Sequence, residues 1–489
     1  MKELLRSRWT LPGILAFGLA LRLIGLESRP LFYDEAFSYF LSIQPFGKIV
    51  QGTAADTMPP LYYFLLHGWA LLGKSVWFLR SLNVLMSLVV IYFVYLIGKL
   101  LFGAEAGAWA AVFTAAAPFQ IYYAQEMRMY TLLALGLSGS LYFFLRVSTG
   151  MRGRAWNWAG LVGFGSIALY SHNLALFTLV VPSIYLILRR KWKLLGQLAI
   201  AQAGMGLIFL PWLLLVPGQV QKIQTAFWTA KPGLVDLVQL VILFVTNLPL
   251  PEWGIIAAAI ISFEILIVVL LESWRNRWFT DQGMLLWLVA VVPGLGLFGV
   301  SNLMRPVFVP RGLIVSALAF YILLARVAAR TSRMVGTLAG VFFVIAALAA
   351  LPAQVNFREF PRPPFREATG WIATHDPAAL VLHENKLSFF PMEFYAPRLG
   401  QAFLPDQPGT PNDTLAPLTA KAMGLSPAED VAAAVGNRSR VDYVVFQREL
   451  QEVKEAGGVD PPGLGWLKAN FRLGGTVAFS DLTIMSFIR

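Results

Sequence analysis

The most constraining feature of this chain is a series of long apolar segments that recur through its first 350 residues. A membrane-spanning helix needs about 20 mostly apolar residues, and fewer where its ends are interfacial. Eleven segments fit: 10–26, 78–100, 104–121, 128–146, 156–171, 174–189, 194–216, 254–273, 283–300, 312–327 and 334–352. A composition of 57% hydrophobic and 13% charged residues, with a mean hydropathy of +0.63, does not suit a water-soluble chain of this length. We predict a polytopic all-α membrane protein with about 11 transmembrane helices.

The formal charge of +12 comes from short basic clusters between these segments. The clusters are Arg6 and Arg8, Arg152 and Arg154, Arg189 to Lys193, Arg275 and Arg277, and Arg326 to Arg333. With the N-terminus in the cytoplasm, each of them falls on the cytoplasmic side, as the positive-inside rule requires. This pattern predicts a protein of the cytoplasmic (inner) membrane and no binding of nucleic acid. The absence of cysteine excludes disulfides, thiolate metal sites and cysteine nucleophiles.

Two further apolar segments do not fit the alternation of cytoplasmic and outer loops that these spans produce. Leu61 to Leu72 is too short to span, and Leu234 to Leu250 lies between proline-containing loops. We interpret both as interfacial or re-entrant helices on the outer face. Whether the second piece spans the membrane stays open.

The composition changes after Pro352, where the sequence becomes proline-rich and polar around Phe360-Pro361-Arg362-Pro363-Pro364. We therefore expect a membrane domain over residues 1–352 and a small extracytoplasmic (periplasmic) α/β domain over 353–489. The pattern in this domain predicts helices over 365–374 and 428–435, buried strands over 379–383 and 441–446, and closing strands within 475–488.

Polar residues gather on the predicted outer face. They are Tyr33-Asp34-Glu35, Asp56 with Tyr62 and Tyr63, Glu126 with Arg128 and Tyr130, Ser171-His172-Asn173, and the loop from Asn302 to Arg311. A carboxylate can remove a proton from an attacking hydroxyl, and fixed guanidinium groups can stabilise a departing phosphate. These groups are the ones that transfer from a phosphorylated lipid would need.

Three motifs in this order resemble the GT-C superfamily of integral membrane glycosyltransferases. They are Leu31-Phe32-Tyr33-Asp34-Glu35-Ala36-Phe37-Ser38, then Pro59-Pro60-Leu61-Tyr62-Tyr63, then Tyr123-Ala124-Gln125-Glu126-Met127-Arg128-Met129-Tyr130. The resemblance is to bacterial relatives of the protein O-mannosyltransferases and of the aminoarabinose transferase of lipid A, that is, to glycosyltransferase family 39. It implies transfer of a sugar from a polyprenyl-phosphate donor to an acceptor hydroxyl on the outer face, by a single inverting displacement.

The resemblance also implies roles for individual residues. Asp34 matches the catalytic base, Glu35 a partner that orients the acceptor or the base, and Glu126 a second acid of the same pocket. The candidates for binding the donor phosphate are Arg128, Arg311, Arg305 and His172. Tyr33, Asp56, Tyr62, Tyr63 and Tyr130 are expected to line the substrate pocket.

Two positions depart from the pattern of the relatives. Met58 stands where relatives often have His or Lys before the two prolines, and Gly312 replaces a tyrosine after Arg311. For some of the candidates a structural role is the alternative. His172 could be a polar cap on a short loop, and Arg305 an interfacial anchor. Glu264, in the middle of an apolar segment, has no assigned role.

A transporter or flippase for polyprenyl lipids, or a non-catalytic lipid-binding membrane protein, is the alternative function. Inverted repeats and polar residues through the bilayer would favour transport, whereas here the acids and arginines gather on one face. We predict no obligatory cofactor, although a divalent metal is compatible with the sequence. The expected partners are the polyprenyl-phosphate sugar, membrane lipids, and a lipid, glycan or protein acceptor. The sugar, hexosyl or pentosyl, and the acceptor are not specified by the sequence.

Overall fold

A computed structural model describes residues 7–151, 153–225, 229–280, 282–330, 333–356, 362–408, 410 and 412–489. Arg6, Arg152 and the Phe360-Pro361 step, all singled out above, lie outside these residues. The chain forms two compact units. Unit 1 comprises Met1–Leu26, Thr57–Gln224 and Thr229–Glu359, and unit 2 is built mainly from Glu27–Asp56 and Phe360–Arg489.

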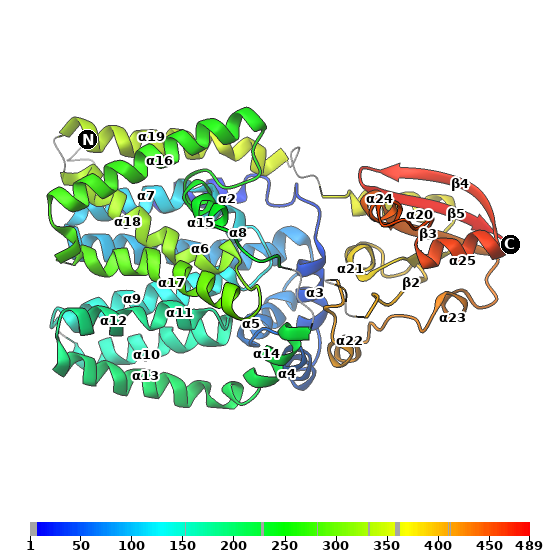
Figure 1. Ribbon diagram of the computed structural model, residues 1–489, viewed down its shortest axis with the longest axis horizontal. Helices are drawn as coiled ribbons and strands as arrows, with labels where there is room; N and C mark the ends of the chain where they lie inside the picture. The colour runs from blue at the N-terminus through cyan, green and yellow to red at the C-terminus, as the bar shows by residue number, and fades with distance from the viewer. Residues whose placement is uncertain are drawn as a thin grey trace. The chain divides into compact units, whose positions relative to one another are not determined.

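Unit 1 is helical, and its long helices lie side by side (Figure 1). Its longer helices are α2 (Thr10–Leu23), α6 (Val76–Phe102), α7 (Ala104–Ala116), α9 (Tyr130–Ser148), α10 (Arg154–Ser171), α13 (Trp192–Leu213), α16 (Glu252–Arg275), α17 (Gly283–Leu303), α18 (Ile314–Arg330) and α19 (Arg333–Asn356). Its shorter ones are α5 (Leu61–Ala70), α8 (Pro118–Ala124), α11 (Ala175–Leu179), α12 (Val181–Leu188), α14 (Val216–Thr225), α15 (Leu234–Val245), η1 (Trp278–Thr280) and η2 (Pro310–Leu313).

Every one of the eleven predicted segments falls on a helix or a broken pair of helices. Among the described residues, 7 helices are long and apolar enough to cross a membrane. The remaining predicted segments correspond to α2, α7 with α8, α10, and α11 with α12. Pro118 starts α8 and Pro182 lies in the first turn of α12, where a proline costs no hydrogen bond. The protein is therefore an integral membrane protein, and the number of spans stays a prediction.

Helix α18 is buried along nearly its whole length, from Ile314 to Ala328. It packs against α7, α17 and α19. The two pieces that did not fit the alternation, at residues 61–72 and 234–250, form the short helices α5 and α15. Both are shorter than the span of a bilayer, as expected for interfacial or re-entrant helices.

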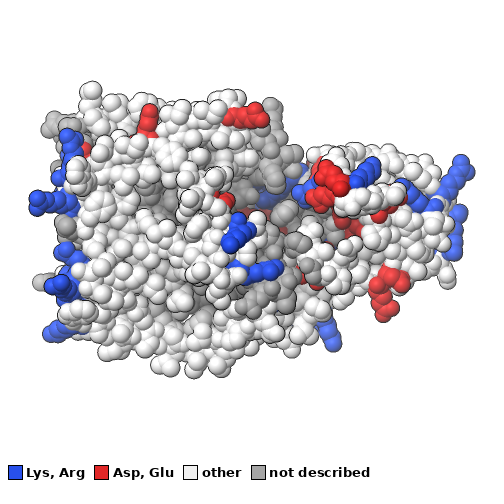
Figure 2. All heavy atoms as spheres, viewed as in Figure 1, with Lys and Arg blue, Asp and Glu red and all other residues white. Residues whose placement is uncertain are grey.

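Basic side chains gather at one end of unit 1. Arg189, Arg190 and Lys191 are exposed in the loop between α12 and α13, and Arg275 and Arg277 are exposed after α16. Figure 2 shows Lys and Arg on this end of unit 1, while the flanks of its helices are almost free of charge. This asymmetry is the one that the positive-inside rule describes.

Unit 2 contains a five-stranded sheet in the order β2-β1-β3-β5-β4. The strands are β1 (Leu380–His383), β2 (Gln401–Phe403), β3 (Arg440–Phe446), β4 (Arg472–Phe479) and β5 (Leu482–Ile488). Strand β1 is parallel to β2 and β3, and β5 is antiparallel to β3 and β4. All four residues of β1 are buried, as expected for a central strand covered on both faces.

Helices cover both faces of this sheet (Figure 1). Two hydrophobic clusters, one on each face, contain α20 (Phe365–His375) with α21 (Lys386–Tyr395), and α23 (Val431–Val435) with α25 (Pro462–Asn470). The remaining helices of the C-terminal segment are α22 (Pro417–Met423) and α24 (Gln447–Glu455). The α/β class predicted for this part of the chain is confirmed.

The segment Glu27–Asp56 packs on this C-terminal segment. It forms α3 (Tyr33–Ser42) and α4 (Phe46–Ala55). Tyr33 packs edge-on against Phe390 of α21, with ring centroids 5.3 Å apart. The hydroxyl of Thr419 in α22 donates to the carbonyl of Gly52, 2.8 Å away. The two segments, distant in the sequence, thus form one folded unit.

Candidate functional site

A tight turn between α8 and α9 carries Glu126 and Arg128. The main-chain N–H of Arg128 donates to the carbonyl of Glu126 over 2.8 Å. Asn83, fully buried in α6, donates its amide Nδ2 to the carbonyl of Glu126 and, over 2.7 Å, to that of Arg128. One side chain from a neighbouring helix thus fixes both ends of the turn. We did not identify Asn83 from the sequence, although an amide inside an apolar segment is a signal for such a bond.

Tyr130, His172 and Arg311 come together beside this turn. Tyr130 begins α9, His172 follows the last residue of α10, and Arg311 lies in η2 just before α18. The ring of Tyr130 is 5.7 Å from that of His172, and the Arg311 guanidinium lies 5.1 Å from the Tyr130 ring centroid. We call Arg128, Tyr130, His172 and Arg311 the basic cluster. Its members lie at the ends of α9, α10 and α18 that are opposite to the basic loops of unit 1.

Arg128, Tyr130 and His172 of the basic cluster are buried, and the buried Glu126 lies in the same turn as Arg128. Burial, followed by the charges of Arg311 and Arg128, lowers the pKa of His172 to about 3. Burial also raises the pKa of the Tyr123 hydroxyl well above its ordinary value, with the Glu126 carboxylate as the next cause and Arg311 opposing it. His172 and Tyr123 are therefore neutral at physiological pH.

His172 has one ring nitrogen that is not satisfied. Its Nδ1 accepts a hydrogen bond of 3.1 Å from the main-chain N–H of Leu174. Because the ring is neutral, its proton is on Nε2. Within the described part of the chain, this buried Nε2–H has no hydrogen-bond partner, and the residue is only 4% exposed. Nδ1 thus forms the loop cap expected from the sequence, and Nε2 is left as a donor for a ligand.

Arg305, also predicted to bind phosphate, is not part of this cluster. It is half-buried and makes no hydrogen bond, ion pair or ring contact with any described residue. At Gly312, a Cβ would meet the end of the Leu174 side chain, two residues after His172, and that side chain would have to move.

The acids Asp34 and Glu35 lie in the first turn of α3, in unit 2. Asp34 is half-buried, and its main-chain carbonyl accepts from the hydroxyl of Ser38 over 2.8 Å. Glu35 is fully buried. Its Oε2 accepts from the main-chain N–H of Phe32 over 3.4 Å and from the Arg362 guanidinium over 3.1 Å. The carboxylate of Glu35 is thus bound inside the protein, and that of Asp34 lies nearer the surface.

The structure distributes the other predicted pocket residues between the two units. Tyr33 is buried against α21, and Asp56 is half-buried at the C-terminal end of α4, both in unit 2. Tyr62 and Tyr63 are fully buried in α5 of unit 1, with their rings edge-on at 6.1 Å.

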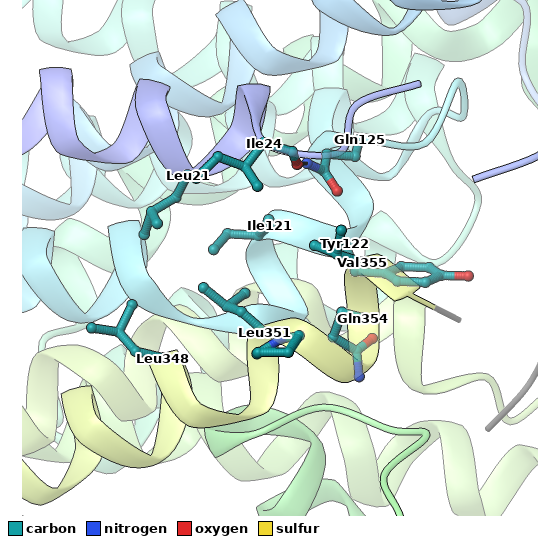
Figure 3. Close-up of a pocket in the computed structure, with 10 residues that line it drawn as sticks. Leu21, Ile24, Ile121, Tyr122, Gln125, Leu348, Leu351, Gln354 and Val355 are labelled. Atoms are coloured by element: carbon teal, nitrogen blue, oxygen red, sulfur yellow. Dashed lines mark hydrogen bonds between the residues drawn. The ribbon is translucent and has the colours of Figure 1, made fainter. Parts of the chain in front are cut away.

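A mainly apolar pocket of about 340 Å³ lies in unit 1 between α2, α8 and α19 (Figure 3). Its walls include Leu21, Ile121 and Leu351. Its amide side chains are already hydrogen-bonded: Gln125 donates to the carbonyl of Ile24 over 2.8 Å, and Gln354 donates to that of Pro249 over 3.0 Å. The pocket therefore suits a hydrocarbon chain and not an anion.

Two ionisable residues of the apolar segments have no part in this site. Arg22 is buried and donates to the carbonyls of Gly18, Thr114 and Ala115, so its role is structural. Glu264 is exposed on α16 and makes no hydrogen bond or ion pair with a described residue. Across the described ranges, no group of three or more His, Asp and Glu side chains has the geometry of a metal site.

Part of the chain matches a known family. A family profile described as dolichyl-phosphate-mannose-protein mannosyltransferase matches residues 57–215. This stretch contains Glu126, Arg128 and His172 but not Asp34. A sequence search among curated proteins returned no match.

Several solved structures share the fold. ArnT from Cupriavidus metallidurans in the apo state has a TM-score of 0.66 at 15% identity, covering 97% of this chain and 97% of that chain. The same protein bound to undecaprenyl phosphate has a TM-score of 0.63 at 14% identity, covering 98% of each. An Archaeoglobus fulgidus oligosaccharyltransferase, tethered to an acceptor peptide with the NVT sequon, has a TM-score of 0.54 at 13% identity, covering 97% of this chain and 74% of that chain. The fold expected from the resemblance is thereby confirmed.

Proposed function

We propose that this chain, which has the fold of the GT-C glycosyltransferases, transfers a sugar from a polyprenyl-phosphate donor to an acceptor hydroxyl. The observation that carries the proposal is the basic cluster, with two arginines and a buried, unsatisfied N–H donor on His172. Such a site suits a phosphate, because charge-assisted hydrogen bonds to its oxygens offset the cost of burying it.

The proposed reaction is a single inverting displacement. Asp34 takes the proton of the acceptor hydroxyl, and the acceptor oxygen attacks the anomeric carbon. The bond between that carbon and the phosphate oxygen breaks, and the polyprenyl phosphate leaves with the bonding electron pair. Arg128, Arg311 and the His172 Nε2–H bind the negative charge that develops on the leaving phosphate. Glu126 would line the same substrate pocket.

The lipid part of the donor has a matching surface in unit 1. We propose that its prenyl chain enters the pocket between α2, α8 and α19, since this pocket offers hydrocarbon walls. Gln125 lines the pocket and directly precedes the Glu126 to Arg128 turn, so the turn begins next to a residue of the pocket lining.

The reaction is proposed to need no divalent metal. The leaving group is a phosphate monoester, and the arginines of the basic cluster supply positive charge next to it. We expect purified enzyme to keep its turnover in excess chelator. A loss of activity that added Mg²⁺ or Mn²⁺ restores would show that this part of the proposal is wrong.

The proposed orientation puts the basic loops of unit 1 in the cytoplasm. The asymmetry of Lys and Arg supports it, because the basic cluster lies at the other ends of the same helices. The chemistry would then take place on the periplasmic side. Because the chain has no cysteine, single cysteines at positions 190 and 302 can be labelled from either side to test this.

The function is tested by incubating purified protein with a panel of polyprenyl-phosphate sugars and measuring the release of polyprenyl phosphate. We expect release with at least one donor, and a loss of about 10²- to 10⁴-fold in Asp34→Asn, the range for removal of a general base. Asp460→Asn is the matched control, since Asp460 forms a surface ion pair with Lys468 in the same unit. Movement of intact donor across vesicles without release would instead support the flippase.

A further inference from the structure

The second acid of the pair, Glu35, has a partner that the sequence did not indicate. Arg362 is buried and lies 3.1 Å from Glu35, with side-chain exposures of 6% and 0%. The two residues are 327 positions apart in the sequence and both belong to unit 2. Placing two charges in a dry environment is costly, and the cost is offset only when the geometry and the additional hydrogen bonds are good.

Arg362 contacts other residues of the same segment besides Glu35. Its Nη1 also donates to the carbonyl of Pro30 over 3.3 Å, and its guanidinium lies 5.0 Å from the centroid of the Phe32 ring. Glu35 in turn accepts from the main-chain N–H of Phe32. Residues 30, 32 and 35, which we call the acidic turn, are thus fixed by one guanidinium. Asp34 lies inside this turn.

The neighbours of Asp34 are fixed as well. Tyr33 is packed against Phe390, and the main-chain N–H of Leu31 donates to the hydroxyl of Tyr395 over 3.0 Å. A general base must be held in its productive geometry within a fraction of an ångström, because small displacements cost large factors in rate. The contacts of the acidic turn provide this restraint for the main chain at Asp34.

We propose that Arg362 is a positioning residue for Asp34, and that Glu35 transmits this effect instead of binding the acceptor. The proposal rests on the proposed function, since it gives Asp34 the role of base. Of the two roles that the resemblance implied for Glu35, orienting the acceptor or orienting the base, the proposal selects the second, because the Glu35 carboxylate is completely buried against Arg362.

The test compares Arg362→Met, Glu35→Gln and the double variant with wild type in the release assay. Each single variant leaves a buried group without its partner, so we expect kcat to fall at least about tenfold with the KM for the acceptor unchanged. Because both variants break the same contact, the double variant should lose no more than the more severe single variant. An acceptor-binding Glu35 would instead give a raised acceptor KM in Glu35→Gln, and the double variant would lose the product of the two single losses.

Arg366→Met is the matched control. Arg366 links the same two segments through Glu27, over 2.7 Å, but this pair is exposed, with side-chain exposures of 57% and 41%. Exposed ion pairs contribute little, so kcat should stay within about twofold of wild type. An equal loss in Arg366→Met and Arg362→Met would mean that any link between the segments matters, and it would overturn the specific role of Arg362.

Amide hydrogen exchange separates this proposal from the proposed function. Arg362→Met should speed exchange in the peptide covering residues 30–42, whereas the peptide covering α9 serves as an internal reference and should not change. If Arg362→Met speeds exchange at residues 30–42 but wild type shows no transferase activity, the restraint by Arg362 stands and the proposed function is wrong. Unchanged exchange at 30–42 would refute the restraint, whatever the activity.

Discussion

His172 in the basic cluster of unit 1 and Glu35 in the acidic turn of unit 2 differ in whether the described residues satisfy their buried polar atoms. His172 keeps a buried N–H donor with no partner among the described residues, next to two arginines. Glu35, in contrast, is closed off by Arg362 and by the N–H of Phe32. The difference suggests that the basic cluster is completed by a ligand, and that the acidic turn is an internal support that presents one carboxylate, Asp34.

Among the residues proposed to bind the donor phosphate, Arg128 is expected to cause the largest loss of activity when it is replaced. Arg128→Gln removes a buried charge from a turn that Asn83 holds in place. We expect kcat/KM for the donor to fall by about 10²- to 10³-fold, as for loss of a preorganised donor to developing negative charge. Arg305→Gln is the control, and steady-state release of polyprenyl phosphate is the measurement. A comparable loss in Arg305→Gln would mean that the phosphate site extends beyond the basic cluster.

His172 sharpens the comparison, because its contribution is a neutral hydrogen bond. His172→Ala should weaken donor binding by about 10- to 100-fold, the range for a bond to a charged group, and His172→Gln should retain part of the affinity through its amide N–H. The pKa of His172 is lowered to about 3, so the ring is already neutral at pH 5.5. Donor affinity should therefore show no histidine titration between pH 5.5 and 8. A wild-type titration near pH 6.5 that His172→Gln abolishes would contradict the neutral donor.

The apolar pocket should give a smaller effect than either polar residue. Leu351→Trp fills the space between α2, α8 and α19. A prenyl chain excluded from it moves into lipid and not into water, so only packing is lost. We expect the KM for long-chain donors to rise by about two- to fivefold, with no change for a short-chain, water-soluble donor. Leu338→Trp, at an exposed position of the same helix, is the control. Equal effects on both donors would show that the chain lies elsewhere.

The smallest expected effect is on the thermal stability of unit 2, and it does not involve the transfer reaction. Burial, followed by the charge of Glu384, raises the pKa of Glu449 from 4.5 to about 7. The folded state thus holds a proton that the unfolded state releases above pH 4.5. This contribution to stability is complete below pH 4.5 and is lost as the pH rises through about 7. Thermal unfolding of Glu449→Gln should depend less on pH in this window than that of wild type. Identical curves would mean that the acid is not buried in solution.

Local patterns in the sequence predicted a large part of the fold. The apolar segments and the buried strands β1 and β3 depend on hydrophobic runs, which short stretches of sequence reveal. Arg128, His172 and Arg311 could be grouped because alternating spans return helix ends to one face, and the structure brings these three together. The hydrogen bonds from Asn83 to the turn were not predicted, because the sequence of one segment does not show which neighbouring helix or loop its amide contacts.

The acidic turn could not be predicted for a related reason. Its support depends on a contact between residues 35 and 362, and no local periodicity reports on such a pair. The assignment of residues 27–56 to the same compact unit as the C-terminal segment depends on similar contacts, such as that of Tyr33 with Phe390. The adjacency of the two carboxylates also gave no sign that Glu35 would be fully buried while Asp34 is only half-buried.

The most direct test of the account is the binding of undecaprenyl phosphate, the lipid product, to wild type, Arg128→Gln and Asp34→Asn. The basic cluster should bind the phosphate and Asp34 should act only on the acceptor hydroxyl. We therefore predict a Kd at least about tenfold weaker in Arg128→Gln, and a Kd within about twofold of wild type in Asp34→Asn, although turnover by that variant should fall by about 10²- to 10⁴-fold. Unchanged binding in Arg128→Gln, or an equal loss in both variants, would contradict the account.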